Sequence, residues 1–279
     1  MQPEQLINLL ESTAPLELAA QWDQSGIQAY GQKEQIEHLA LCLDPDPSTI
    51  TSALHWGADF ILSHHPLSLS PGLPNQDNSY TQALRLLFCS GAWLYSAHTS
   101  LDVQTTGPAA WLARDLGWKN LRPVQPLFPA QSGHKPDPRD STVDVGYGIL
   151  GELSRACTPA EFYLLLGQTL ELRYCRSCGP EPQVLRQAAY CPGSGMDLAD
   201  QAFAQGADIF ISGDLKYHQA QELCNLGLVL DVGHFVLEER MMQIWALELD
   251  SRLDSQKIQV RFFPGQDCIR IQDLLKNRA

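Results

Sequence analysis

The strongest constraint on the fold of this chain is that its sequence repeats itself. Displaced by 149 positions, residues 40–63 align with residues 189–212, and GADFILS in the first copy matches GADIFIS in the second. A second block, residues 91–102, aligns with residues 227–238 at a displacement of 136. Strand–helix–strand segments resemble one another by patterning alone, but here polar and apolar positions both match and the blocks keep their order. The pattern indicates an internal duplication.

The first copy alternates apolar runs with helical patterns. It predicts a helix at 3–20 broken at Pro15, a strand at 38–44, a helix at 48–56 ended by Gly57, a strand at 58–63, a helix at 79–90, a strand at 93–97 and a helix at about 104–116. Such alternation is typical of a layered α/β fold with a largely parallel sheet. With the duplication, it predicts two related layered α/β domains with a metal site between them.

A proline-rich stretch separates the two copies. Residues 123–138 contain repeated prolines and little periodicity, which is typical of a linker. We therefore expect a first domain at residues 1–122 and a second at residues 139–279. A chain of 279 residues is long enough to bury a core in each.

The charge of the chain excludes some partners. Its formal net charge is −13 and its pI is near 4.9, so general electrostatic binding of nucleic acid is not expected, although local cation binding is. We see no apolar run long enough for a membrane span and no signal peptide. We therefore expect a cytoplasmic protein with reduced cysteines. Cys175 and Cys178 form a CxxC, but without a second CxxC two ordinary thiols are favoured over zinc or redox use.

A histidine and an acid recur at the same spacing in both copies. His98 and Asp102 follow one predicted strand, and His234 and Glu238 follow the matching strand of the second copy. If each pair begins a helix, the i,i+4 spacing puts both side chains on one face. An imidazole beside a carboxylate makes half of a divalent metal site.

Two adjacent histidines, His64 and His65, end the strand ADFILS just before Pro66. In open α/β sheets, ligands bind at the carboxyl ends of strands. A single first-row metal takes three or four protein ligands, whereas two ions about 3.5–4 Å apart use more. Imidazole and carboxylate suit zinc, iron, manganese or nickel without selecting among them. The six candidate ligands are His64, His65, His98, Asp102, His234 and Glu238.

The other histidines have an ordinary interpretation. A lone histidine is more often a hydrogen-bonded surface or core residue than a ligand, and we interpret His38, His55 and His134 in this way. A structure in which the six candidate side chains pointed apart would extend that interpretation to them.

Several motifs together resemble a known family. In order along nearly the whole chain, WDQSGIQ, LSHHPL, HTSLD, GSG, GDLKYH and GHFVLE resemble the Nif-three-like dinuclear metal-centre family, whose bacterial members are often labelled GTP cyclohydrolase 1 type 2 homologues. The resemblance implies a two-domain α/β subunit, a toroidal homohexamer and a metal pair facing the internal cavity. It also implies metal ligation at the same six positions.

Other polar residues have two interpretations each. Lys216 and His218 follow the repeated strand and are candidate catalytic residues that bind an anionic substrate or donate a proton; the alternative is a solvated helix start. The GSG at 193–195 forms an amide cradle for an anion or a plain tight turn. Asp23 supports the site or fixes a turn.

These residues lead to two hypotheses about function. The first is a metal-dependent hydrolase of a small, nucleotide-like molecule, in which two divalent ions activate a water. The second is non-enzymatic: metal storage or delivery, or a regulatory assembly that binds other proteins. Both use the same six ligands.

Overall fold

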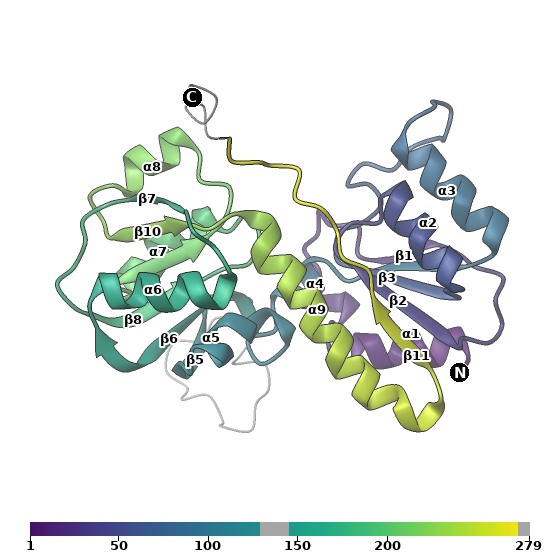
Figure 1. Ribbon diagram of the computed structural model, residues 1–279, viewed down its shortest axis with the longest axis horizontal. Coiled ribbons are helices and arrows are strands. Elements are labelled where there is room, and N and C mark those ends of the chain that lie inside the picture. Colours follow the sequence, from purple (N-terminus) through teal and green to yellow (C-terminus); the bar gives the residue numbers. More distant parts are fainter. Residues whose placement is uncertain (129–144, 273–279) are drawn as a thin grey trace, which may run out of the picture.

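The structure, a computed structural model, describes residues 1–128 and 145–272. It has two lobes, each built on one sheet with helices packed against it, and helix α9 runs between them (Figure 1). The helices are α1 (Pro3–Glu11), α2 (Pro47–Trp56), α3 (Ser79–Ser90), α4 (Thr99–Asp102), α5 (Trp111–Asp115), α6 (Pro159–Leu170), α7 (Ala199–Ala204), α8 (Tyr217–Leu223) and α9 (His234–Leu253). The strands are β1 (Gly26–Ala29), β2 (His38–Cys42), β3 (Phe60–Ser63), β4 (Trp93–Ser96), β5 (Lys119–Pro126), β6 (Gly146–Cys157), β7 (Arg176–Cys178), β8 (Leu185–Tyr190), β9 (Ile209–Ser212), β10 (Leu228–Asp231) and β11 (Gln259–Phe262).

The first sheet has the strand order β1-β4-β3-β2-β11. Strands β2, β3 and β4 are parallel neighbours, and β1 runs antiparallel to β4 at one edge. Every residue of β3 and β4 is buried, as expected for apolar runs covered on both faces. Asp46 precedes helix α2 and its carboxylate caps the amides of the first turn, and Gly57 with φ 98° caps the other end.

The second sheet repeats this arrangement and confirms the predicted pair of related domains. Its order is β5-β6-β8-β9-β10-β7, with β8, β9 and β10 parallel and β7 antiparallel to β10. Leu39 pairs with Phe60 in the first sheet, and Ala188 pairs with Ile209 in the second. Both residues of the second pair follow their counterparts by 149 positions.

The two copies also share a polar contact. The Asp59 carboxylate accepts hydrogen bonds from the backbone amides of residues 37 and 38. The Asp208 carboxylate does the same for the amides of residues 186 and 187. Equivalent carboxylates therefore bind the backbone amides at the starts of the equivalent strands β2 and β8.

The strand pairing corrects the predicted displacement between residues 91–102 and their copy at residues 227–238. Trp93 pairs with Phe60, and Leu228 pairs with Ile209, which gives a displacement of 135 for the strands, not the predicted 136. One additional residue, Gly233 with φ 91°, precedes α9 and restores the match between the histidines. The second copy thus holds one more residue between its strand and its helix.

Two predicted helices are shorter than expected. The predicted helix at 3–20 ends at Glu11, and residues 16–18 form a separate 3₁₀ turn. The predicted helix at 104–116 is interrupted by Gly107 and Pro108, so that only α5 and a 3₁₀ turn at 108–110 form. Proline lacks the amide that a continuous helix would need at this position.

The two sheets do not divide the chain along the predicted domain ranges. The start of the predicted linker, Pro123–Pro126, belongs to β5 in the second sheet, while residues 129–138, including His134, lie outside the described residues. Strand β11, within the predicted second domain, is paired with β2 in the first sheet. The chain therefore returns to its first lobe after α9 (Figure 1).

Buried contacts join the lobes around α9. The indole Nε1 of Trp111 donates to the Leu237 carbonyl at 2.9 Å, and the Tyr190 hydroxyl donates to the Ala109 carbonyl. One cluster of buried apolar side chains contains residues of both sheets, with Trp111 and Trp245 among its largest members. In the two described ranges, no helix is both long and apolar enough to cross a membrane.

Candidate metal centre

The six predicted ligands come together between the lobes. His64 and His65 directly follow β3, His98 follows β4 by one residue and caps α4, and Asp102 ends that helix. In the second lobe β10 leads to α9, which carries His234 as its first residue and Glu238 one turn later. Helix α4 and the start of α9 lie in the middle of the molecule (Figure 1). The structure thus brings the six side chains together, from positions after β3, β4 and β10.

Glu238 contacts histidines from both halves of the chain. Its Oε1 lies 3.6 Å from the Nε2 of His64. Its Oε2 lies 3.0 Å from the Nε2 of His65 and 2.7 Å from the Nε2 of His234. The Oδ1 of Asp102 lies 3.6 Å from the Nε2 of His64. The two oxygens of Glu238 therefore face two different sets of ligand atoms.

The six side chains form three overlapping groups, each of which could hold a metal ion. Within a group, one ligand atom from each residue lies within 4.8 Å of the others. The groups are His64, His65 and His98; His65, His234 and Glu238; and His64, Asp102 and Glu238. The ring of His98 lies 5.2 Å from that of His64 and 5.5 Å from that of His65, centroid to centroid.

Each of the four histidines has its Nδ1 atom occupied by an oxygen. His64 Nδ1 lies 2.8 Å from the Ala97 carbonyl. The other three face carboxylates: His65 that of Asp44 at 2.6 Å, His98 that of Asp23 at 2.8 Å and His234 that of Asp214 at 2.8 Å. An oxygen partner at Nδ1 fixes the tautomer and leaves Nε2 free to bind a metal, as in carboxylate–histidine–metal sites.

Two buried atoms of the cluster support this assignment. The Nε2 of His64 and the Oδ1 of Asp102 have no hydrogen-bond partner among the described residues. Leaving such atoms buried and unpaired costs about 1–3 kcal/mol each. His64 is fully buried. An ion bound between these atoms would satisfy both, so the donor set fits a divalent metal.

The pKa values of the site residues in the metal-free protein also favour binding of a cation. Burial would raise the pKa of Glu238, but the imidazoles of His64, His234 and His65 outweigh it and hold that pKa well below its usual range. Burial would lower the pKa of His65, but Asp44 and Glu238 raise it to about 10. The cluster therefore attracts positive charge, which a divalent cation supplies in place of protons.

Asp44 and Asp214 are site residues that the sequence reasoning did not assign. The duplication contained a signal for Asp214, because it matches His65 at the displacement of 149, and the structure shows it holding His234. Asp44 matches Gly193 in the second copy. The first copy thus contributes the additional candidate ligands His64 and His65. At the matching places the second copy contributes the Asp214 carboxylate, which contacts His234, and Gly193, which leaves space for a neighbouring side chain.

Two glycines provide that space. A Cβ atom on Gly193 would lie 2.0 Å from the Oε1 of Glu238, and one on Gly213 would lie 2.4 Å from the backbone nitrogen of His234. The Gly195 amide donates to the Ser212 hydroxyl at the end of β9 at 2.9 Å, so it is not free to bind an anion. The GSG stretch therefore serves close packing around Glu238.

Lys216 and His218 lie at the start of α8, with both side chains exposed. The Lys216 amide bonds to Gln219, and His218 Nδ1 bonds to Gln221 at 3.2 Å. Neither residue belongs to the three groups of candidate ligands. Their catalytic role stays a prediction. Asp23, in contrast, contacts His98 directly.

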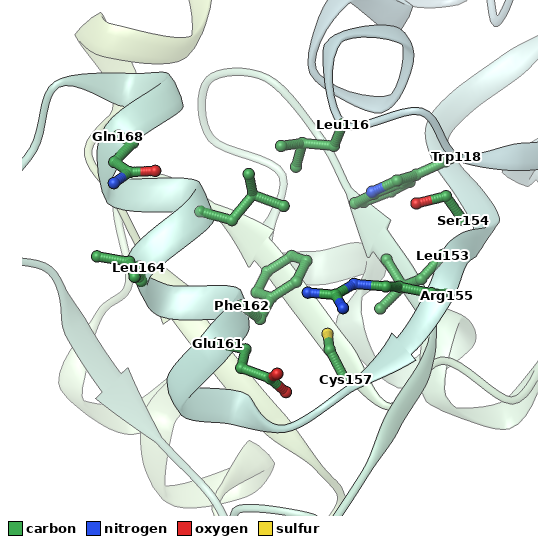
Figure 2. A pocket seen from close by; sticks show the side chains of 11 residues that line it. Leu116, Trp118, Leu153, Ser154, Arg155, Cys157, Glu161, Phe162, Leu164 and Gln168 are labelled. Atoms are coloured by element: carbon green, nitrogen blue, oxygen red, sulfur yellow. The ribbon is translucent and has the colours of Figure 1, made fainter.

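A separate pocket of about 270 Å³ lies between α6 and β6 (Figure 2). Its lining is mainly apolar, with the ring of Phe162 and the side chains of Leu116, Trp118 and Leu153 turned toward it. It contains none of the six candidate ligands, so it is distinct from the candidate metal centre.

Comparisons with known proteins agree with this fold and identify the family. The model of the family described as Duf34/NIF3 (NGG1p interacting factor 3) matches residues 1–268. A Clostridium perfringens protein named GTP cyclohydrolase 1 type 2 homolog is 30% identical over 257 residues, covering 91% of this chain and 94% of the relative. A Bacillus cereus protein related to NIF3 has a solved structure that superposes with a TM-score of 0.84 at 22% identity, covering 98% of this chain and 99% of the other. The reduced HcgD structure from Methanocaldococcus jannaschii superposes with a TM-score of 0.76 at 25% identity, covering 94% and 98%. This chain belongs to the Duf34/NIF3 family.

Proposed function

We propose that the protein binds two divalent metal ions, zinc, iron, manganese or nickel, at the six-residue cluster. His64, Asp102 and Glu238 would hold one ion, and His65, His234 and Glu238 the other. His98 adds a further imidazole beside His64 and His65. The observation that carries this proposal is the position of Glu238, whose two oxygens face two ligand groups. A carboxylate shared in this way is typical of two-metal sites.

We further propose that the bound centre makes the protein a hydrolase of a small molecule. When bound, two divalent ions supply Lewis acidity that lowers the pKa of a water toward neutrality. The cluster opens on one side, since the exposed fraction of the side chain rises from 0% at His64 to 22% at His65 and 32% at His234. An opening beside these ligands supports access by a substrate, which a closed storage site would not need.

The residues of the chain have separable tasks in this proposal. Asp44, Asp23 and Asp214 orient imidazoles through Nδ1, which keeps Nε2 directed at the centre. Lys216 or His218 remains the first candidate for moving a proton to or from the substrate. The name of the C. perfringens relative, GTP cyclohydrolase 1 type 2 homolog, supports a ring-containing substrate.

Elemental analysis of the purified protein, paired with a hydrolase screen, tests the proposal. We expect two ions per chain in the wild type, and loss of metal and turnover in His65→Ala. His55→Ala is the matched control, because His55 is exposed at the end of α2 and should keep both properties.

Two results would contradict the proposal in different ways. Fewer than one ion per chain, without uptake of added zinc, manganese or iron, would exclude the metal centre. Two ions per chain without turnover of any small molecule would favour metal storage, metal delivery or a regulatory assembly. The homohexamer implied by the resemblance and the cytoplasmic location expected from the sequence stay predictions, and light scattering in solution checks the first.

A further inference from the structure

One tryptophan stands exposed beside the candidate metal centre. The side chain of Trp22 is 62% exposed, whereas Trp93, Trp111, Trp118 and Trp245 are all buried. Its ring lies 5.9 Å from the His98 ring, centroid to centroid, at an interplanar angle of 80°. An indole exposed to water does not gain the favourable free energy of burying its apolar surface. Its exposure next to a candidate ligand therefore suggests a binding role.

The loop that carries Trp22 is fixed on both sides of the ring. Before it, the Ala20 amide donates to the Thr99 hydroxyl at 2.9 Å. After it, the Asp23 carboxylate accepts from the amide and hydroxyl of Thr99 and faces His98 Nδ1 at 2.8 Å. Trp22 is therefore held at one place on the rim of the centre.

The rim and the ligand set combine five carboxylates with four imidazoles, and the imidazoles are neutral when they bind a metal ion. Asp23, Asp44 and Asp214 face the histidines, and Asp102 and Glu238 are candidate ligands. Among the described residues, no lysine or arginine forms an ion pair with any of these five carboxylates. Two divalent ions add four positive charges, which five carboxylates more than offset. The net charge of such a site gives no long-range attraction for a polyphosphate.

We propose that Trp22 is the stacking surface for a planar heteroaromatic ring without phosphates, such as a nucleoside, held over the metal centre. This inference rests on the proposed metal centre and names its substrate class. A flat ring can lie on the exposed indole face while its edge points toward His98 and the ions. Stacking of a base on an aromatic side chain is sequence-tolerant and strong enough for an alanine variant to lose about 10- to 100-fold in affinity.

Calorimetric titration of the metal-loaded protein with guanosine and with GTP tests the proposal. We expect guanosine to bind more tightly than GTP, and Trp22→Ala to bind guanosine about 10- to 100-fold more weakly with its metal content unchanged. Trp22→Phe should keep most of the affinity but lose the quenching of tryptophan fluorescence by guanosine. Phe88→Ala is the matched control, because Phe88 is an aromatic residue that is 60% exposed on α3 and lies outside the cluster.

The outcomes separate this inference from the proposed function. Equal guanosine affinity in wild type and Trp22→Ala, or no binding of guanosine by a fully metal-loaded protein, would overturn the role of Trp22. Tighter binding of GTP than of guanosine would overturn the preference for a ring without phosphates. Each of these results would leave the metal centre standing. Failure of the wild type to take up metal would overturn both.

Discussion

The Nε2 atom of His65 and the Oε2 atom of Glu238 lie 3.0 Å apart, although the two residues come from opposite halves of the chain. His65 follows β3 in the first sheet, and Glu238 lies on α9 after β10 of the second. The candidate metal site thus depends on both copies of the duplication at once. Contacts that hold the lobes together should therefore also affect the site.

The carboxylates behind the histidines should control metal affinity. We expect Asp44→Asn to weaken metal binding by about 10- to 100-fold, because the amide cannot hold the His65 imidazole as the carboxylate does. Competition with a chelator of known affinity measures this. Asp46→Asn is the control two residues away, since asparagine caps α2 as well as aspartate and should leave affinity unchanged. Equal weakening in both variants would contradict the role of Asp44.

Space at Gly193 should be needed for Glu238 to reach the centre. In Gly193→Ala the new methyl group would collide with Glu238 Oε1, so we expect loss of bound metal as well as of stability. Gly57→Ala provides the comparison, because its φ is also positive but its Cβ would meet open space. That variant should lose only about 1–2 kcal/mol of unfolding free energy and keep its metal. Thermal unfolding and elemental analysis distinguish the two; full metal in Gly193→Ala would refute the steric argument.

Protons and metal should compete at two histidines. Burial would lower both pKa values, but carboxylates raise the pKa of His65 to about 10 and that of His234 to about 9 in the metal-free protein. Because these values lie above the unfolded value of about 6.5, the associated stability is present below pH 6.5 and is lost between about pH 6.5 and 10. Thermal unfolding of the metal-free protein across this range measures the loss.

The same pKa values predict how metal binding depends on pH. A metal ion needs neutral imidazole, so affinity should rise from pH 6.5 toward pH 10 and binding near pH 7.5 should release protons. Calorimetry in buffers of different ionisation enthalpy measures that release. Binding of zinc at pH 7.5 without proton release would contradict it.

The Tyr190 hydroxyl should stabilise the junction of the lobes. It donates to the Ala109 carbonyl and accepts from the Leu112 amide at 3.3 Å, and it is fully buried. Tyr190→Phe should lose about 1–3 kcal/mol of unfolding free energy, because two buried backbone groups are left unpaired. Denaturant unfolding measures this against Tyr80→Phe, whose hydroxyl makes one long bond of 3.4 Å. Equal stability of the two variants would show that the junction does not depend on this bond.

Much of the fold could be predicted because its signals are local. Apolar runs of four or five residues between turn and cap residues predicted β2, β3 and β4, and the repeat carried that pattern to β8, β9 and β10. The six candidate ligands were also predicted, since the ends of parallel strands meet at one edge whatever the details of packing.

Other features depend on contacts that are distant in sequence. The pairing of β11 with β2 follows from α9, whose 20 residues span about 30 Å and return the chain to the first lobe. The predicted linker start became part of β5 because its register with β6 satisfies backbone groups that the sequence alone leaves undetermined.

The sequence by itself determined the duplication, the two sheets and the set of candidate metal ligands, because each depends on the spacing and type of residues along the chain. Only the tertiary structure decided that Asp44 and Asp214 orient His65 and His234, that Gly193 makes room for Glu238 and that Trp22 stands exposed at the rim. These relationships depend on the direction of side chains from separate elements. That direction is fixed only when the two lobes pack together.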